Sequence, residues 1–158
     1  MFKSARWIVL ATLLVVTCAA VSAQTMDKAN ASAPATAATY FAKDKVTQAM
    51  TSGTALYNGK IYRVQMGRRT EPGQVEVHTK DSDVFYIVEG SGTFVTGGTM
   101  VGGKSTGPGE FRGTSITGGE THHLTKGDVI VIPDSVPHWW QQIQEPVIYF
   151  TVKEVTGH

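Results

Sequence analysis

Hydrophobic and polar residues alternate in short runs along most of this chain, which predicts β-strands rather than long helices. The runs begin at residue 54 and are separated by Gly, Asn and Pro. Asn58-Gly59 lies between the first two runs and is the strongest short signal for a β-hairpin. Turns are also expected at Gly90-Ser91-Gly92 and at Gly97-Gly98. The predicted strands are 54–57, 60–66, 74–78, 84–88, 92–96, 120–125, 129–133, 138–143 and 147–155.

One segment before these strands has helical periodicity instead. Apolar residues recur at helical spacing over 40–50, and Gly53 follows as a typical helix stop. We expect a short helix here that covers an open end or face of the strand assembly. The predicted fold class is therefore all-β, an antiparallel β-barrel with a short N-terminal helix.

The segment 96–121 departs from this alternation. It contains nine Gly residues and almost no run that could form core. Loops of this length are usually either mobile or functional. Two interpretations follow, a solvated excursion or a lid over the mouth of the barrel. In the second case the side chains in contact with ligand would be Met100, Phe111, Arg112 or Ile116.

The first residues resemble a secretory signal peptide. Lys3 and Arg6 precede an apolar run over 7–16, and small residues end at Ala23, where a signal peptidase would cleave. Cys18 raises the alternative of a lipoprotein signal, but the residues before it fit that signal poorly. We expect a signal peptide at 1–23, a flexible Ala/Thr/Ser-rich spacer at 24–38 and a single domain at 39–158, exported to the periplasm or outside the cell.

Composition changes this picture in two ways. Cys18 is the sole cysteine, so the mature protein is expected to fold without disulfides. Removal of Lys3 and Arg6 leaves twelve basic and thirteen acidic side chains, a net charge of −1 in place of +1 for the whole chain. This balance gives no electrostatic reason to expect nucleic acid as a partner, or a membrane surface after signal cleavage.

A strand, a rigid turn and a histidine follow one another over residues 127–138. Gly127 opens the strand, Pro133 begins the turn, and His138 starts the next strand. This stretch resembles the second motif of the cupin family, whose pattern is Gly, five residues, Pro, one residue, Gly, two residues, His, three residues and Asn. Ser135 and Gln142 occupy the positions of the second Gly and the Asn.

The stretch 74–90 resembles the first cupin motif, which ends on a Gly. Counting back from Gly90 places Asp83 at the Glu position, His78 at the second His and Glu76 at the first. A register with His78 as the first His makes the interval to Asp83 too short. The resemblance implies a cupin-type jelly roll of the small single-domain kind that occurs in exported bacterial proteins.

The resemblance also implies a metal site formed by Glu76, His78, Asp83 and His138. Glu76 and His78 are two apart in a strand, so their side chains project from the same face. Two imidazoles and two carboxylates favour Mn(II) or Fe(II), and Zn(II) or Ni(II) can also be bound. The alternative is a site without metal, in which Glu76 faces solvent, Asp83 caps a turn and His138 packs against Trp140.

Other residues are candidates for a substrate pocket or are set aside. Trp140 shares the face of His138, and His122 shares that of Leu124. Arg68 and Arg69 are expected to form a solvated rim with Glu partners and are given no site. The substrate-pocket candidates are Trp140, Gln142, His122 and Tyr86.

Two functions remain open from the sequence. One is an enzyme in which a divalent metal ion acts on a small molecule in the barrel, of the dioxygenase, isomerase or lyase type. The other is a cupin module that binds a small molecule or metal without catalysis. Cupins support many reactions, so the fold does not choose between these functions. A homodimer is common in the family and would cover apolar strand faces.

Overall fold

The computed structural model describes residues 37–155. The predicted signal peptide and nearly all of the predicted spacer lie outside these residues. Within the described range, no helix has the length and apolar character needed to cross a membrane. The elements are α1 (Lys43–Ser52), β1 (Ala55–Asn58), β2 (Tyr62–Arg69), β3 (Val75–His78), β4 (Asp81–Thr96), β5 (Thr99–Val101), β6 (Lys104–Gly107), β7 (Glu110–Gly113), β8 (Ser115–Thr117), β9 (Glu120–Thr125), β10 (Val129–Ile132) and β11 (His138–Val155).

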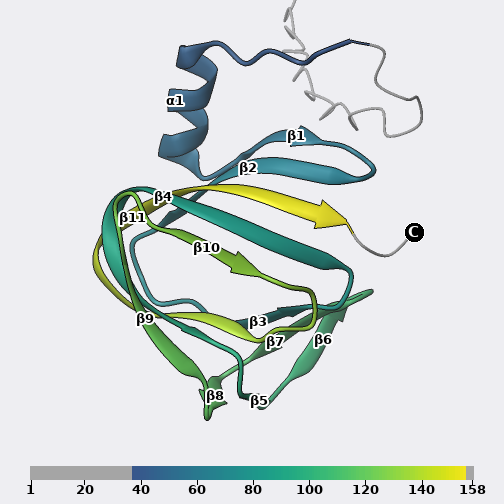
Figure 1. Cartoon of the computed structure of the whole chain (residues 1–158), viewed down its shortest axis with the longest axis vertical. Helices are drawn as coiled ribbons and strands as arrows, with labels where there is room; N and C mark the ends of the chain where they lie inside the picture. Colours follow the sequence, from purple (N-terminus) through teal and green to yellow (C-terminus); the bar gives the residue numbers. More distant parts are fainter. Residues whose placement is uncertain (1–36, 156–158) are drawn as a thin grey trace, which may run out of the picture.

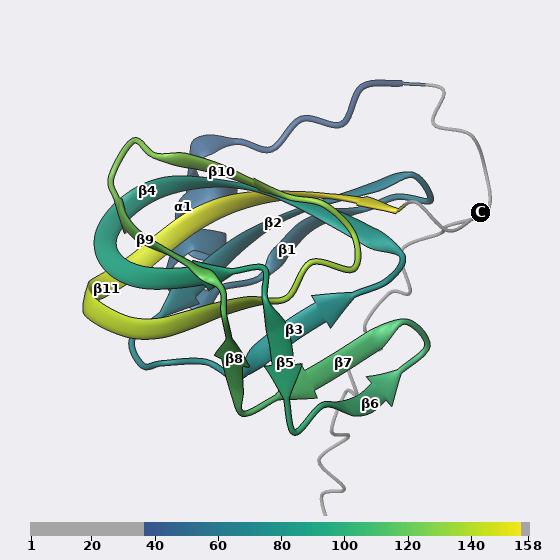
Figure 2. The ribbon, with the colours of Figure 1, turned by 60° about the horizontal axis from the view of Figure 1, so that its bottom comes forward.

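The strands curve around a common interior, as Figures 1 and 2 show. One antiparallel sheet runs in the order β1-β2-β11-β3-β7-β6, and β4 joins it by pairing with β11, β10 and β9. The strands β5 and β8 form a separate two-stranded ribbon. In Figure 2, β3, β7 and β6 lie side by side and form one wall. The prediction of an all-β antiparallel fold with one short N-terminal helix is confirmed.

The N-terminal helix and hairpin follow the sequence signals closely. The helix ends at Gly53, whose left-handed backbone (φ 65°) lets its N–H bond to the carbonyl of Ala49. It begins at Lys43, later than the predicted start, and packs on β2 and β1 outside the sheet (Figure 1). β1 and β2 form the hairpin expected at Asn58-Gly59, and Gly59 N–H bonds to the carbonyl of Tyr62 at 3.0 Å.

Two predicted pairs of strands are single long strands in the structure. The residues predicted as 84–88 and 92–96 belong to β4, and those predicted as 138–143 and 147–155 belong to β11. The turn expected at Gly90-Ser91-Gly92 was wrong. Gly90 (φ 81°) is where β4 bends against β11, and a Cβ there would lie 1.9 Å from the Pro146 carbonyl oxygen. The glycine therefore permits the backbone of β11 to come close to β4, and the chain does not reverse here.

The core fills the interior between β4, β9, β10 and β11. Its aromatic members are in contact: the Phe94 ring centroid lies 4.7 Å from that of Trp140, and Phe85 lies 4.7 Å from Tyr149. Burial of these rings supplies much of the apolar area removed from water on folding. The core comprises Phe85, Ile87, Phe94, Leu124, Ile132, Trp140, Val147 and Tyr149. His138 packs against this core beside Phe94.

The Gly-rich segment 96–121 forms short strands instead of an irregular loop. It folds into β5, β6, β7 and β8, and β7 pairs with β3 in the register Glu76↔Arg112 and His78↔Glu110. The contact of Arg112 with a ligand, which was expected for a lid, stays a prediction, and Arg112 lines the cavity described below. The segment extends the sheet and brings two charged residues beside β3.

Candidate metal centre

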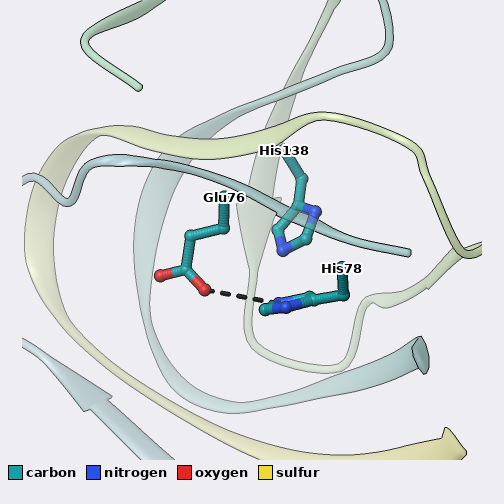
Figure 3. Close-up of side chains that lie close together, drawn as sticks. All are labelled: Glu76, His78 and His138. Carbon is teal, nitrogen blue, oxygen red and sulfur yellow. Dashed lines mark ion pairs between the residues drawn. The ribbon is translucent and has the colours of Figure 1, made fainter. Parts of the chain in front are cut away.

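Strands β3 and β11 bring two imidazoles and a carboxylate together. Glu76 and His78 come from β3, and His138 is the first residue of β11, where it pairs in register with Glu76. Figure 3 shows the three side chains pointing toward one another. One ligand atom from each lies within 4.8 Å of the other two. The cluster therefore forms because β3 and β11, which are far apart in the sequence, pair in this register, and because Glu76 and His78 project from the same face of β3.

Each imidazole is held by a hydrogen bond from its Nδ1 atom. His138 Nδ1 donates to the carbonyl oxygen of Val136 at 3.0 Å, and His78 Nδ1 donates to the Glu110 carboxylate at 2.7 Å. Both acceptors lack a proton to give, so they fix the proton on Nδ1 and direct Nε2 into the cluster. Metal-ligating histidines are oriented in this way by carbonyl and carboxylate partners.

The turn before His138 explains how the imidazole is aimed. Ser135 has a left-handed backbone (φ 63°), and its N–H bonds to the carbonyl of His78 at 2.7 Å. The cupin motif has Gly at this position, which accepts such a conformation without strain. The turn thus ties the start of β11 to the end of β3, and both imidazoles occupy fixed positions, with ring centroids 5.1 Å apart.

The donor set fits a divalent metal ion. His78 Nε2 lies 3.5 Å from Glu76 Oε2 and 3.5 Å from Asp83 Oδ2, while His138 Nε2 lies 3.8 Å from Asp83 Oδ2. Acceptor atoms that converge in this way repel one another unless a proton or a cation lies between them. Metal bonds of about 2.1 Å place ligand atoms at most about 4.2 Å apart, so small side-chain movements would complete the site.

The ionisation states of His138 and Glu76 suit metal binding. Burial lowers the pKa of His138, against the opposing effects of Val136 and Asp83, so its imidazole is neutral at neutral pH. Burial would raise the pKa of Glu76, but the neighbouring His78, Arg112 and Arg69 outweigh it and lower the value to about 2. A neutral imidazole and an ionised carboxylate are the forms that coordinate metals.

Asp83 lies beside the cluster but forms an ion pair with Lys153. Its side chain is 2% exposed, and Lys153 Nζ lies 2.7 Å from Oδ1 and 2.9 Å from Oδ2. Its Oδ2 atom also faces both imidazoles. The interpretation of Asp83 as a fourth ligand therefore stays a prediction, because any metal there would compete with Lys153.

Several charged residues of the centre escaped the sequence analysis. Glu110 and Arg112 come from the segment interpreted as a loop or lid, although Arg112 was considered there as a contact to ligand. Arg69, set aside as part of a solvated rim, donates to Glu76 Oε1 at 2.8 Å. Glu110, Phe111 and Arg112 alternate between polar and apolar residues, which is a strand pattern. This was the one signal in the sequence that could have placed Glu110 and Arg112 on a strand.

The four residues predicted to line a substrate pocket have different surroundings. Trp140 is 3% exposed, packs on Phe94, and borders a recess of about 20 Å³ beside His138. His122 is half-buried and lies 3.0 Å from the Thr96 hydroxyl, through its Nε2. Gln142 is exposed next to Gln144. Tyr86 is 45% exposed on the outer face of β4, away from the core and from the candidate centre.

A charged cavity of about 370 Å³ opens beside the cluster. Its lining includes Glu76 and His78 of the candidate centre, and its remaining walls come from β2, β4, β7 and β11. The lining residues are Arg63, Gln65, Arg69, Glu76, His78, Asp81, Asp83, Phe85, Glu110, Arg112, Tyr149 and Lys153. A volume of this size admits a small organic molecule.

Replacing Glu110 by alanine should weaken metal binding about 10- to 100-fold, the usual effect of removing the partner that orients a ligating histidine. The Glu110→Gln variant should lose less affinity, because its amide oxygen can still accept from His78 Nδ1. Competition against a metal-sensitive dye measures these affinities. Glu120→Ala is the matched control, since Glu120 is exposed and lies on β9, which pairs with β4 and not with β3. Wild-type affinity in Glu110→Ala would show that His78 does not depend on this bond.

Comparison with known proteins places this jelly-roll architecture and its centre in a family. The family model described as Cupin matches residues 61–157, and the chain belongs to the cupin family. A search of curated protein sequences found no significant match. The predicted cupin-type jelly roll is confirmed.

The similar solved structures share little sequence with the chain. A Bacillus halodurans protein is 14% identical, with a TM-score of 0.52, and the alignment covers 75% of this chain and 83% of that one. A Klebsiella pneumoniae protein with a double-stranded β-helix domain is 16% identical, with a TM-score of 0.46 and coverage of 66% and 76%. A cupin protein of Bacteroides fragilis is 14% identical, with a TM-score of 0.44 and coverage of 62% and 69%. At 14% identity, the likeness to the Bacillus halodurans protein shows the fold alone.

Proposed function

We propose that this cupin binds one divalent metal ion through Glu76, His78 and His138 and uses it to bind, or act on, a small molecule in the adjacent cavity. The observation that supports this most strongly is the direction of the two imidazoles. Each is held through Nδ1, by Glu110 or by the Val136 carbonyl, and presents Nε2 to the Glu76 carboxylate. With both protons on Nδ1, the Nε2 lone pairs face carboxylate oxygens, an arrangement that a bound cation stabilises.

The protein's own residues define what the centre does. Glu76, His78 and His138 would hold the ion where β3 and β11 pair. The side of the ion that faces the cavity would then be open to a ligand. A bound ion would supply a Lewis acid that polarises a ligand oxygen. Phe94 and Trp140 pack behind His138 and keep water from that side.

The ligand chemistry bears on which metal is bound. Imidazole and carboxylate ligands suit Mn(II) and Fe(II), and they also accept Zn(II) and Ni(II). We propose Mn(II) or Fe(II), because a mixed nitrogen and oxygen set without thiolate is harder than the sites that select copper(I).

The experiment that tests this proposal is metal binding by protein that has first been stripped with a chelator. Titration with Mn(II) should reach one ion per chain and should raise the midpoint of thermal unfolding. Stabilisation of about 2.7 kcal/mol is expected at a free metal concentration of 100 times Kd. Elemental analysis and differential scanning calorimetry measure the two quantities. If neither Mn(II), Fe(II), Zn(II) nor Ni(II) binds in stoichiometric amounts, the proposal is wrong.

A further inference from the structure

We propose that Arg69 and Arg112 form, together with the metal ion, a binding site for the carboxylate group of a small organic acid. This inference rests on the proposed function, because it takes the ion to be held by Glu76, His78 and His138. It goes further by naming the class of ligand and the residues that recognise it.

The first argument is the charge of the cavity. Four cationic side chains and four acidic ones line it, so their charges cancel before a metal ion binds. A divalent ion held by Glu76 and His78 adds two positive charges to the wall of this cavity. Excess charge of one sign in such a cleft attracts ligands of the opposite sign. The loaded cavity is therefore matched to an anion. The cationic residues are Arg63, Arg69, Arg112 and Lys153, and the acidic ones are Glu76, Asp81, Asp83 and Glu110.

The second argument is that the four cations have different partners. Lys153 forms an ion pair with Asp83, and Arg63 forms one with Asp81. Both carboxylates are buried, so these two cations already have partners. The other two guanidinium groups meet at a metal ligand instead. Arg69 Nη2 lies 2.8 Å from Glu76 Oε1, and Arg112 Nη2 lies 3.6 Å from Glu76 Oε2.

Metal binding changes the situation of these two arginines. When Glu76 coordinates an ion, its negative charge is shared with that ion, and the guanidinium groups then lie beside a second cation. Their mutual repulsion is removed if an anion bridges the ion and the guanidinium groups. Arg112 retains its bond to Glu110 at 3.3 Å, which positions it on the cavity wall.

A third observation comes from the recess of about 20 Å³ beside His138. Arg69, Gln74, Trp140 and Tyr149 border it, and all four side chains carry a hydrogen-bond donor. The Arg69 Nε and Trp140 Nε1 atoms are buried without a hydrogen-bond partner. Burial raises the pKa of Tyr149, so its hydroxyl keeps its proton. Buried donors without partners are costly, and this space is the size of one oxygen atom.

The shape of the guanidinium group favours a carboxylate among the oxyanions. Its planar fork of N–H donors matches the two oxygens of a carboxylate, and such pairs are among the stronger hydrogen bonds in proteins. A carboxylate could share one oxygen with the metal ion and direct the other toward Arg69 or Arg112. The cavity of about 370 Å³ limits the acid to a small molecule.

The test is calorimetric titration of the Mn(II)-loaded protein with malonate, malonamide and inorganic phosphate. Malonate should bind, and malonamide, which has the same skeleton without charge, should not. Arg69→Gln and Arg112→Gln should each weaken malonate binding about 10- to 100-fold, the loss expected for one hydrogen bond between charged groups. Arg69→Lys keeps the charge without the fork and should give an intermediate loss. Arg68→Gln is the matched control, because Arg68 is exposed on the neighbouring position of β2.

Metal content is measured first for every variant. Arg69→Gln should bind Mn(II) at least as tightly as the wild type, because the guanidinium no longer competes for Glu76, and this opposite effect separates a role in ligand binding from loss of fold. Unchanged malonate binding in both arginine variants, equal binding of malonamide, or stronger binding of phosphate would each overturn the proposal. A wild-type protein that takes up no metal overturns the proposed function. Malonate binding to that metal-free protein, lost in both variants, would then preserve the role of the arginines.

Discussion

Replacing His138 by alanine should reduce the bound metal of the purified protein from one ion per chain to a small fraction of that. The affinity should fall by more than about 100-fold, because loss of a ligand costs more than loss of the partner that orients one. His138 is the only ligand that β11 provides within the described cluster. The other two ligands, Glu76 and His78, come from the neighbouring strand β3. Elemental analysis after dialysis and titration with Mn(II) measure the loss. His78→Ala should give a loss of similar size.

Folding must be separated from ligation in this experiment, because the His138 side chain is buried next to Phe94. His138→Gln retains most of the volume and should also lose the metal, while its circular dichroism stays that of the wild type. His123→Ala is the matched control, since His123 is exposed on β9 and belongs to no metal cluster of residues 37–155. Full metal content in both folded His138 variants would exclude the proposed centre.

Local signals in the sequence predicted the ends of elements better than their continuity. The Gly53 helix stop, the Asn58-Gly59 hairpin and the strand at 120–125 depend on a few neighbouring residues, and the structure confirms them. The bends in β4 and β11 depend on distant contacts. Gly90 looks like a turn residue, yet it bends β4 because the Pro146 carbonyl approaches it from β11. Composition alone cannot distinguish a glycine in a turn from a glycine at which a neighbouring strand comes close.

The candidate site divides in the same way. Glu76, His78 and His138 belong to two short motifs with defined spacing, so counting along the sequence was enough to propose them. Glu110 and Arg112 reach the centre only through pairing of β7 with β3. Nine glycines dilute the alternation of segment 96–121, and its strands are only three or four residues long. Their place in the sheet depends on the edge that β3 offers, which no local pattern encodes.

The ion pair between Asp83 and Lys153 is a further product of strand register, because the two residues are directly paired across β4 and β11. Replacing Lys153 by methionine should destabilise the protein by about 3–5 kcal/mol, the cost of leaving a buried charge without its partner. Asp83 is 2% exposed and Lys153 8%, so water cannot take the place of the lost ammonium group. Urea unfolding followed by fluorescence or circular dichroism measures the change in the free energy of unfolding.

A double-mutant cycle gives this prediction its control and decides the role of Asp83. In Asp83→Asn/Lys153→Met the buried charges are gone together, and stability should recover most of the loss, because a neutral pair avoids the desolvation of both ions. A double variant as unstable as Lys153→Met would show that methionine itself is misfitted. Its metal content answers the other question. Retention of one ion per chain means that Glu76, His78 and His138 are sufficient, whereas loss of the ion from a folded double variant makes Asp83 a ligand that exchanges Lys153 for the metal.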